Sequence, residues 1–189
     1  TGAVIAMNVR TMTRWVAERF PRSAVESLRD VAHWWGRTTS GLRLQPRVIV
    51  VGAQRCGTTT LYRVLSEHPD IVRPTFSKGI FYFGINYAKG ARWYRGHFPV
   101  AALARRRVAG PEPVAFESSG YYSFHPLAAG RIGRDLPGVK LVLMVRDPVE
   151  RAYSAFKHES ARGFETETFE DALALEPSRL EGEVERMVA

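Results

Sequence analysis

The stretch Val48–Leu65 constrains the fold of this chain more than any other, because it joins a strand to a helix through a glycine-containing loop. Val48–Val51 is an unbroken run of β-branched residues, which is typical of a strand buried on both faces of a parallel sheet. After the loop, apolar residues recur at helical spacing at Leu61, Val64 and Leu65. The pattern therefore predicts an α/β fold with a parallel sheet.

The loop between this strand and this helix has the chemistry of an oxyanion cradle. Gly52 and Gly57 allow backbone N–H groups to converge on an anion, and the N-terminus of the helix adds partial positive charge. The single cysteine of the chain, Cys56, lies inside the loop, where we expect it to be a small filler rather than a reactive thiol. The residues expected to bind the anion are Arg55, Cys56, Gly57, Thr58, Thr59 and Thr60.

The spacing of Gly52 and Gly57 matches the nucleotide P-loop, G-x-x-x-x-G, but Thr58 stands where that motif has lysine. An NTPase needs this lysine on its β- and γ-phosphates, whereas a donor with a single 5′ phosphate group needs only the cradle and a nearby cation. The glycine spacing still leaves a P-loop nucleotide kinase as one alternative interpretation of this loop. A strand–helix turn that binds no ligand is a second alternative.

A second strand–helix junction follows the apolar run at 139–145, which we expect to be a buried strand, and it reads RDPVERAYSAF. Asp147 suits the N-cap of a helix and Pro148 suits its first position. Arg146 would then lie at the carboxyl end of a strand, where open α/β sheets bind ligands, with Ser154 two turns along the helix. Simple pairing of Arg146 with Asp147 or Glu150 is the structural alternative.

Together, the two junctions resemble the sulfotransferases that use 3′-phosphoadenosine-5′-phosphosulfate (PAPS), in particular the Golgi glycan sulfotransferases and their bacterial relatives. The 5′-phosphosulfate loop of that family reads much like Gly52–Leu61, and Arg146 with Ser154 matches its 3′-phosphate signature. The resemblance implies a three-layer α/β domain with a central parallel sheet, as in P-loop kinases. It also implies transfer of a sulfuryl group from PAPS to a hydroxyl or amine of a glycan or small-molecule acceptor, with PAP as product.

The resemblance further implies catalytic residues, and here the chain departs from the family. The family motif reads lysine, glutamate, two variable residues and an aromatic pair, and its glutamate is the general base. This chain keeps Lys78, which would stabilise the leaving group, but has Gly79 in place of the base. The remaining candidate bases, in order of preference, are Glu117, His97 and His125.

A third family motif reads glutamate, lysine, Ser/Thr, proline, any residue and tyrosine. Glu117, Ser119 and Tyr122 match it, whereas Ser118 replaces the lysine and Gly120 replaces the proline. A second catalytic cation is thus exchanged for a hydroxyl. These departures support the alternative of a degenerate, non-catalytic PAP-binding protein.

The composition fits one domain that binds anions. Of the 189 residues 45% are apolar, and 27 Lys and Arg against 19 Asp and Glu give a net charge of +8. A basic nucleic-acid-binding protein is therefore a further alternative, although we do not expect nucleic acid to be the partner. One cysteine excludes an internal disulfide and argues against a zinc site, and we expect no metal.

We divide the chain into an N-terminal amphipathic helical segment, 1–45, and a sulfotransferase-like domain, 46–189. Apolar residues at helical spacing predict helices over 12–20 and 24–35, and five arginines lie among them, so peripheral membrane contact through residues 10–35 is one interpretation and packing on the domain is the other. No apolar run is long enough to span a bilayer, and we expect a cytoplasmic protein. Nothing matches the C-terminal loop of the family, which indicates a fragment or a short member.

Overall fold

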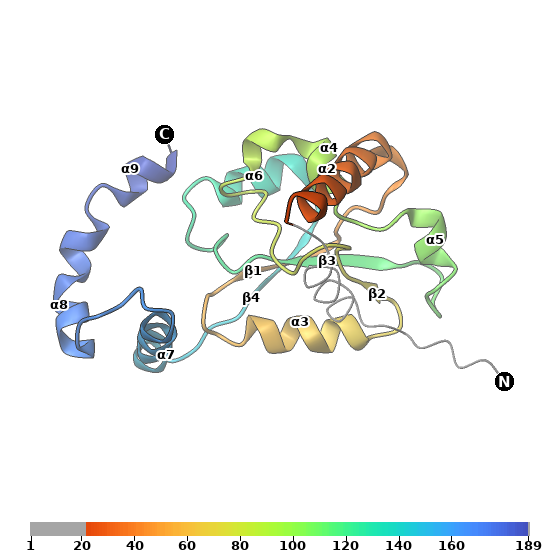
Figure 1. Ribbon diagram of the computed structural model, residues 1–189. Coiled ribbons are helices and arrows are strands. Elements are labelled where there is room, and N and C mark those ends of the chain that lie inside the picture. The colour runs from red at the N-terminus through yellow and green to blue at the C-terminus, as the bar shows by residue number, and fades with distance from the viewer. Residues whose placement is uncertain (1–21, 189) are drawn as a thin grey trace.

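A parallel sheet of four strands lies at the centre of the computed structural model, which describes residues 22–188 (Figure 1). The helix expected over 12–20 lies outside the described residues. The strands lie in the order β2-β3-β1-β4. Their bounds are β1 Val48–Gly52, β2 Ile71–Val72, β3 Val114–Ser118 and β4 Lys140–Leu143.

Helices cover both faces of this sheet, which confirms the predicted three-layer α/β class. Figure 1 shows α3 on one face and α2, α4 and α6 on the other. The helices expected around 24–35, from 58 and after Asp147 are all present. Their bounds are α2 Arg22–Thr38, α3 Thr58–Glu67, α4 Ala91–Arg95, α5 Ala101–Arg105, α6 Ala128–Asp135, α7 Pro148–Ala161, α8 Phe169–Leu180 and α9 Glu183–Val188, with 3-10 turns at Ser40–Leu42 and Tyr87–Lys89.

The strand register brings the loops that carry the sequence motifs to one edge of the sheet. Ile49 of β1 lies opposite Glu117 of β3 on one side and opposite Leu141 of β4 on the other, with all three strands parallel. The carboxyl ends of β1, β3 and β4 therefore meet at the same edge. This is the edge at which open α/β sheets bind ligands.

Aromatic side chains fill the core between the sheet and the helices on the α4 side. Tyr82 and Tyr94 stack with ring centroids 4.5 Å apart, and Phe83, Phe98 and Tyr122 are buried around them. Burying rings of this size removes about 150–250 Å² of surface per residue from water, so the cluster dominates the apolar burial here. The segment that follows Lys78 is thereby anchored in the core.

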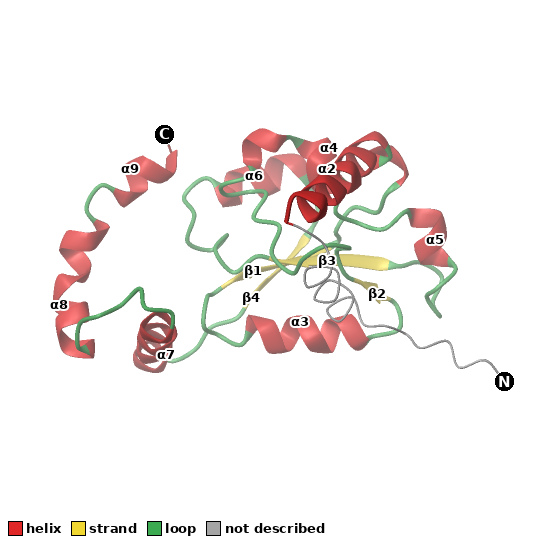
Figure 2. Ribbon diagram, in the orientation of Figure 1, coloured by secondary structure: helices red, strands yellow, loops and turns green. Residues whose placement is uncertain are grey.

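Strand β4 differs from the buried strand that its apolar run predicted. Leu141 and Leu143 are more than half exposed, and Val145 is 80% exposed. The physical reason is the position of β4 at the end of the sheet, where β1 is its only neighbouring strand among the described residues. Figure 2 shows α8 and α9 set apart from the sheet, following α7.

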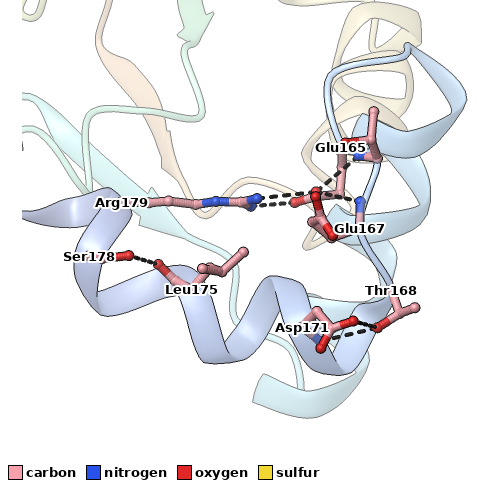
Figure 3. Close-up of polar contacts among 8 residues, drawn as sticks. Glu165, Glu167, Thr168, Asp171, Leu175, Ser178 and Arg179 are labelled. Carbon is pink, nitrogen blue, oxygen red and sulfur yellow. Dashed lines mark hydrogen bonds and ion pairs between the residues drawn. The ribbon is translucent and has the colours of Figure 1, made fainter.

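A side-chain cap explains where α8 begins. The hydroxyl of Thr168 accepts a hydrogen bond from the Asp171 backbone N–H at 3.2 Å (Figure 3). An exposed ion pair, Arg179 Nη1 to Glu165 Oε2 at 2.6 Å, connects the far end of α8 to the preceding loop. Phe169 packs against α7, with its ring centroid 5.3 Å from that of Tyr153.

Candidate anion-binding and catalytic site

The loop after β1 leaves backbone N–H groups of α3 open to a ligand. Gly57 is the N-cap of α3 and has φ of +83°, a left-handed conformation that glycine adopts without strain. The first N–H groups of a helix have no partner inside it, and those of Thr58 and Thr59 find no acceptor within residues 22–188. Together with the helix dipole, these donors form a cradle for an anion.

Lys78 reaches this cradle from a different part of the chain. Its Nζ donates to Thr59 Oγ1 at 2.9 Å and to Thr58 Oγ1 at 3.3 Å. Burial lowers the pKa of Lys78, and the charge of Arg63 lowers it further. No carboxylate pairs with Lys78 in the described part of the chain, so its charge is available to an anion in the cradle.

Arg55 joins the cradle loop to the helix that follows the RDP segment. Its Nε donates to Ser154 Oγ of α7 at 3.3 Å, across 99 positions of sequence. The neighbouring Gln54 donates from Nε2 to the Tyr121 hydroxyl at 3.0 Å, which ties the loop after β3 to the same place. Residues from three motifs therefore meet around one loop. The contacts of Gln54 and Tyr121 were not predicted, and no local sequence pattern indicates them.

Cys56 is 7% exposed, with its Sγ 3.7 Å from the Gln54 carbonyl oxygen. Its side chain therefore fills the inside of the loop.

Arg146 lies where the strand β4 gives way to α7, and it pairs with a neighbour. Its Nη2 contacts Glu150 Oε2 at 2.5 Å, which is the structural alternative foreseen for this residue. Asp147 caps α7 as predicted, with its Oδ1 accepting from the Glu150 N–H at 3.0 Å. Both members of the ion pair are exposed, and such pairs contribute about 0–1 kcal/mol, so a phosphate could compete for Arg146.

Glu117 lies at the end of β3 and is completely buried. Its Oε1 accepts hydrogen bonds from Ser119 Oγ at 2.5 Å and from the Tyr122 hydroxyl at 2.6 Å, and its Oε2 accepts from the Tyr94 hydroxyl at 2.5 Å. Burial raises the pKa of Glu117, and these three hydroxyls oppose the rise. A carboxylate enclosed in this way has no exposed surface to offer an acceptor, which argues against its predicted place as the preferred base.

The same network fixes the segment that carries Lys78. Ser119 Oγ accepts from the Phe81 backbone N–H at 3.1 Å, and the Tyr122 hydroxyl accepts from the Phe83 N–H at 3.4 Å. The buried carboxylate thus holds two side chains that in turn hold the backbone just after Lys78. Its role in this geometry is to position that segment.

The comparison with known proteins now decides the family. Residues 45–180 match the family model described as "Sulfotransferase domain". The chain belongs to the sulfotransferase family. The fold and the family expected from the two strand–helix junctions are thereby confirmed.

Individual relatives agree with this assignment. The chain is 34% identical over 121 residues to the bifunctional heparan sulfate N-deacetylase/N-sulfotransferase 1 of Xenopus laevis. This match covers 61% of this chain and 13% of that protein. It is 37% identical over 112 residues to the membrane-associated sulfotransferase kil1 of Dictyostelium discoideum, covering 59% of this chain and 22% of that protein. The match therefore spans less than a quarter of the length of either curated relative.

A solved structure shows the same likeness. The crystal structure of a sulfotransferase from Alicyclobacillus acidocaldarius superposes with a TM-score of 0.57 at 33% sequence identity. The match covers 73% of this chain and 59% of that one.

In this chain an aromatic ring occupies the place beside Gly79. A Cβ atom on Gly79 would lie 2.6 Å from Cε2 and 2.7 Å from Cζ of Phe81. Phe81 itself has φ of +54°, which is uncommon for a residue with a side chain. A carboxylate at this position would therefore require the Phe81 ring to move.

The two histidine candidates lie in different environments. His97 is 5% exposed, its Nδ1 is 2.9 Å from the Trp93 carbonyl oxygen, and burial lowers its pKa. It packs among the rings of His33, Phe76 and Trp93, which argues against the prediction that it serves as a base. His125 is only partly buried and lies in the loop after β3. Partial burial, and then the charge of Arg131, lowers the pKa of His125, which favours its neutral form at physiological pH.

Proposed function

We propose that this sulfotransferase transfers a sulfuryl group from PAPS to a hydroxyl or amine of an acceptor and releases PAP. The observation that carries the proposal is the position of Lys78, whose Nζ lies 2.9 Å from Thr59 Oγ1 at the N-terminus of α3. A cation and an open helix N-terminus at one point suit a transferring, negatively charged group. Within the described residues, no group of acidic or His side chains suitable for a metal accompanies them.

The residues of the cradle and of α7 fit the two anionic ends of PAPS. Arg55, Gly57 and Thr58–Thr60, with the N–H groups at the start of α3, would hold the 5′-phosphosulfate. Arg146 and Ser154 would hold the 3′-phosphate. The contact between Arg55 and Ser154, at 3.3 Å, supports this assignment because it places the two sets of residues side by side, as binding to the two ends of one PAPS molecule requires.

PAPS supplies an activated sulfuryl group whose leaving group is a phosphate. The task of the chain is to align donor and acceptor and to stabilise charge that develops on the bridging oxygen. Lys78 is the residue proposed for that charge. For the acceptor proton we propose His125, because Glu117 and His97 are enclosed and His125 is the partly exposed member of the three predicted bases.

We further propose that the acceptor is a glycan. The relative from Xenopus laevis is described as a heparan sulfate N-sulfotransferase, and the same type of acceptor would suit a chain with a net charge of +8. An amine or hydroxyl on an acidic glycan is then the nucleophile. A small-molecule acceptor remains the broader form of the proposal.

A panel of ligands in a thermal shift assay tests the proposed donor. PAP is expected to raise the melting temperature, because a ligand at 100 times its Kd stabilises a protein by about 2.7 kcal/mol. Mg-ATP and a single-stranded oligonucleotide are expected to raise it far less. A larger shift with Mg-ATP would favour a kinase, and a larger shift with the oligonucleotide would favour a nucleic-acid-binding protein.

The 3′-phosphate site makes a sharper prediction. Arg146→Ala is expected to weaken PAP binding by about 10–100-fold, since a hydrogen bond to a charged group is worth about 1.5–3 kcal/mol. Binding of adenosine 5′-phosphate, which lacks the 3′-phosphate, should change little. Isothermal titration calorimetry measures both affinities.

Glu150→Gln is the matched control for this experiment. It releases Arg146 from the ion pair at 2.5 Å, so PAP affinity should be retained or increased. Equal losses for PAP and adenosine 5′-phosphate in Arg146→Ala would contradict the assignment.

We also propose that the domain contacts a membrane surface through α2. No helix in the described part of the chain is long and apolar enough to cross a bilayer. Leu28, Val31, Trp34 and Trp35 of α2 are nevertheless each at least half exposed. The relative from Dictyostelium discoideum is described as membrane-associated, which supports contact at the surface.

A further inference from the structure

Helix α2 packs against α4 with its backbone and leaves its most apolar side chains outside. A Cβ atom on Gly36 would lie 2.9 Å from the carbonyl oxygen of Gly96, so the two elements approach too closely for a side chain at this point. The exposed large apolar residues of α2 lie three or four positions apart, apart from the adjacent tryptophans, and so share one side of the helix. We call Leu28, Val31, Trp34 and Trp35 the apolar stripe.

A cavity of about 470 Å³ lies where the end of α2 meets α4. Arg37 of α2 and Arg92 and Arg95 of α4 line it, together with the small or polar residues Thr38, Ser40, Gly41 and Ala91. No acidic side chain lines this cavity. We call it the arginine cavity.

The three arginines of this cavity lack ion-pair partners in the described part of the chain. The Nε of Arg95 is buried without a hydrogen-bond partner there. Three like charges around one cavity repel one another, and a buried N–H without an acceptor is costly. A tetrahedral anion in the cavity would offset the repulsion between the arginines, because guanidinium groups match its oxygens in pairs.

The arginine cavity and the apolar stripe adjoin each other. A neighbouring hollow is lined by Trp34 as well as by Arg37 and Arg92, and Asp30 and Lys89 also contribute to it. Indole side chains prefer the headgroup level of a membrane, and aliphatic side chains on the same helix face insert just below it. A soluble anion would use the arginines but gives no reason for exposed Leu28 and Val31.

We propose that the arginine cavity binds the phosphate of an anionic phospholipid headgroup while the apolar stripe lies in the membrane interface. This inference deepens the proposed membrane contact by naming its ligand and its binding residues. It is independent of sulfuryl transfer, because none of its residues belongs to the cradle. Figure 1 shows α2 and α4 on the face of the sheet opposite α3, so bound lipid would leave the start of α3 uncovered.

Vesicle sedimentation of the full chain tests the proposal. The double variant Arg37→Ala/Arg92→Ala is expected to bind phosphatidylcholine vesicles containing phosphatidylserine about 10–30-fold more weakly than the parent, since each basic residue near such a surface contributes about 1 kcal/mol. Arg105→Ala/Arg106→Ala removes the same charge from the exposed end of α5 and should change binding less than about threefold. Arg95→Lys keeps the charge but loses the planar fork, and it should also weaken binding.

Several outcomes would overturn the proposal. Equal losses in the two double variants would indicate diffuse attraction and no specific cavity. A cavity variant that loses binding to inorganic phosphate, glycerophosphoserine or a heparin oligosaccharide while vesicle binding stays unchanged would assign the cavity to a soluble anion. Unchanged vesicle binding in Trp34→Ser would show that the apolar stripe does not lie in the membrane interface. An unchanged thermal shift with PAP shows that each variant is folded and separates this result from a failure of the proposed donor site.

Discussion

Replacing Lys78 by alanine is expected to lower kcat by about 10²–10³-fold, as when one donor to developing charge is removed from an active site. The reason is that its Nζ lies beside Thr58 and Thr59, where the 5′-phosphosulfate is proposed to bind, and no second lysine stands at Ser118 to share the task. Turnover with PAPS and an amine-bearing glycan provides kcat and KM separately. The loss should lie mainly in kcat.

Lys157→Ala is the control, because Lys157 is an exposed lysine on α7. It should leave both constants within about twofold, as is usual for surface substitutions. A Lys78→Ala enzyme with normal kcat and raised KM would show that Lys78 binds the donor equally in the ground state and the transition state. The proposed stabilisation of the leaving group would then be wrong.

The second large effect concerns stability. Glu117→Ala is expected to reduce the free energy of unfolding by about 3–5 kcal/mol, because it leaves a cavity and removes the acceptor of three buried hydroxyls. The hydroxyls of Tyr94, Ser119 and Tyr122 all donate to this one carboxylate. Denaturation in urea measures the change. Glu112→Ala removes an exposed carboxylate five positions earlier and should cost less than about 0.5 kcal/mol.

The same carboxyl group predicts a pH dependence with a definite sign. Burial raises the pKa of Glu117 in the folded chain, so the folded state holds this proton more tightly than the unfolded state does. Its contribution to stability is therefore complete below the unfolded pKa of about 4.3 and is lost as the pH rises through the raised, folded pKa. Glu117→Gln should reduce the loss of unfolding free energy as the pH rises. Identical pH profiles for parent and Glu117→Gln would contradict the raised pKa.

Local patterns in the sequence predicted the parts of the fold that depend on neighbours along the chain. The strand at Val48–Gly52, the helix from Thr58 and the N-cap at Asp147 all follow from residues within one or two turns. Strand β4 shows the limit of this approach. An apolar run predicts extended structure, but only the order of the strands decides how much of Leu141 and Leu143 is covered.

In the candidate site, too, some features follow from local sequence and others depend on distant parts of the chain. The resemblance to sulfotransferases identified Lys78, Arg55 and Ser154 as site residues, and the structure brings them to the cradle loop. Glu117 was preferred as the base because of its expected place at the carboxyl end of a strand, where side chains usually face the ligand edge. The burial of Glu117 depends on Tyr94, which lies 23 positions earlier on a different element. No pattern around Glu117 itself indicates that contact.

The ring of Phe81 beside Gly79 restricts the order in which this chain could exchange residues during evolution. A Cβ atom at position 79 would lie 2.6 Å from that ring, so a glutamate acquired there first would meet a collision before it could act as a base. A smaller residue at position 81 would open the room, and glutamate could follow. The two positions are therefore expected to be epistatic: glutamate at position 79 should be better tolerated once a smaller residue stands at position 81 than beside Phe81.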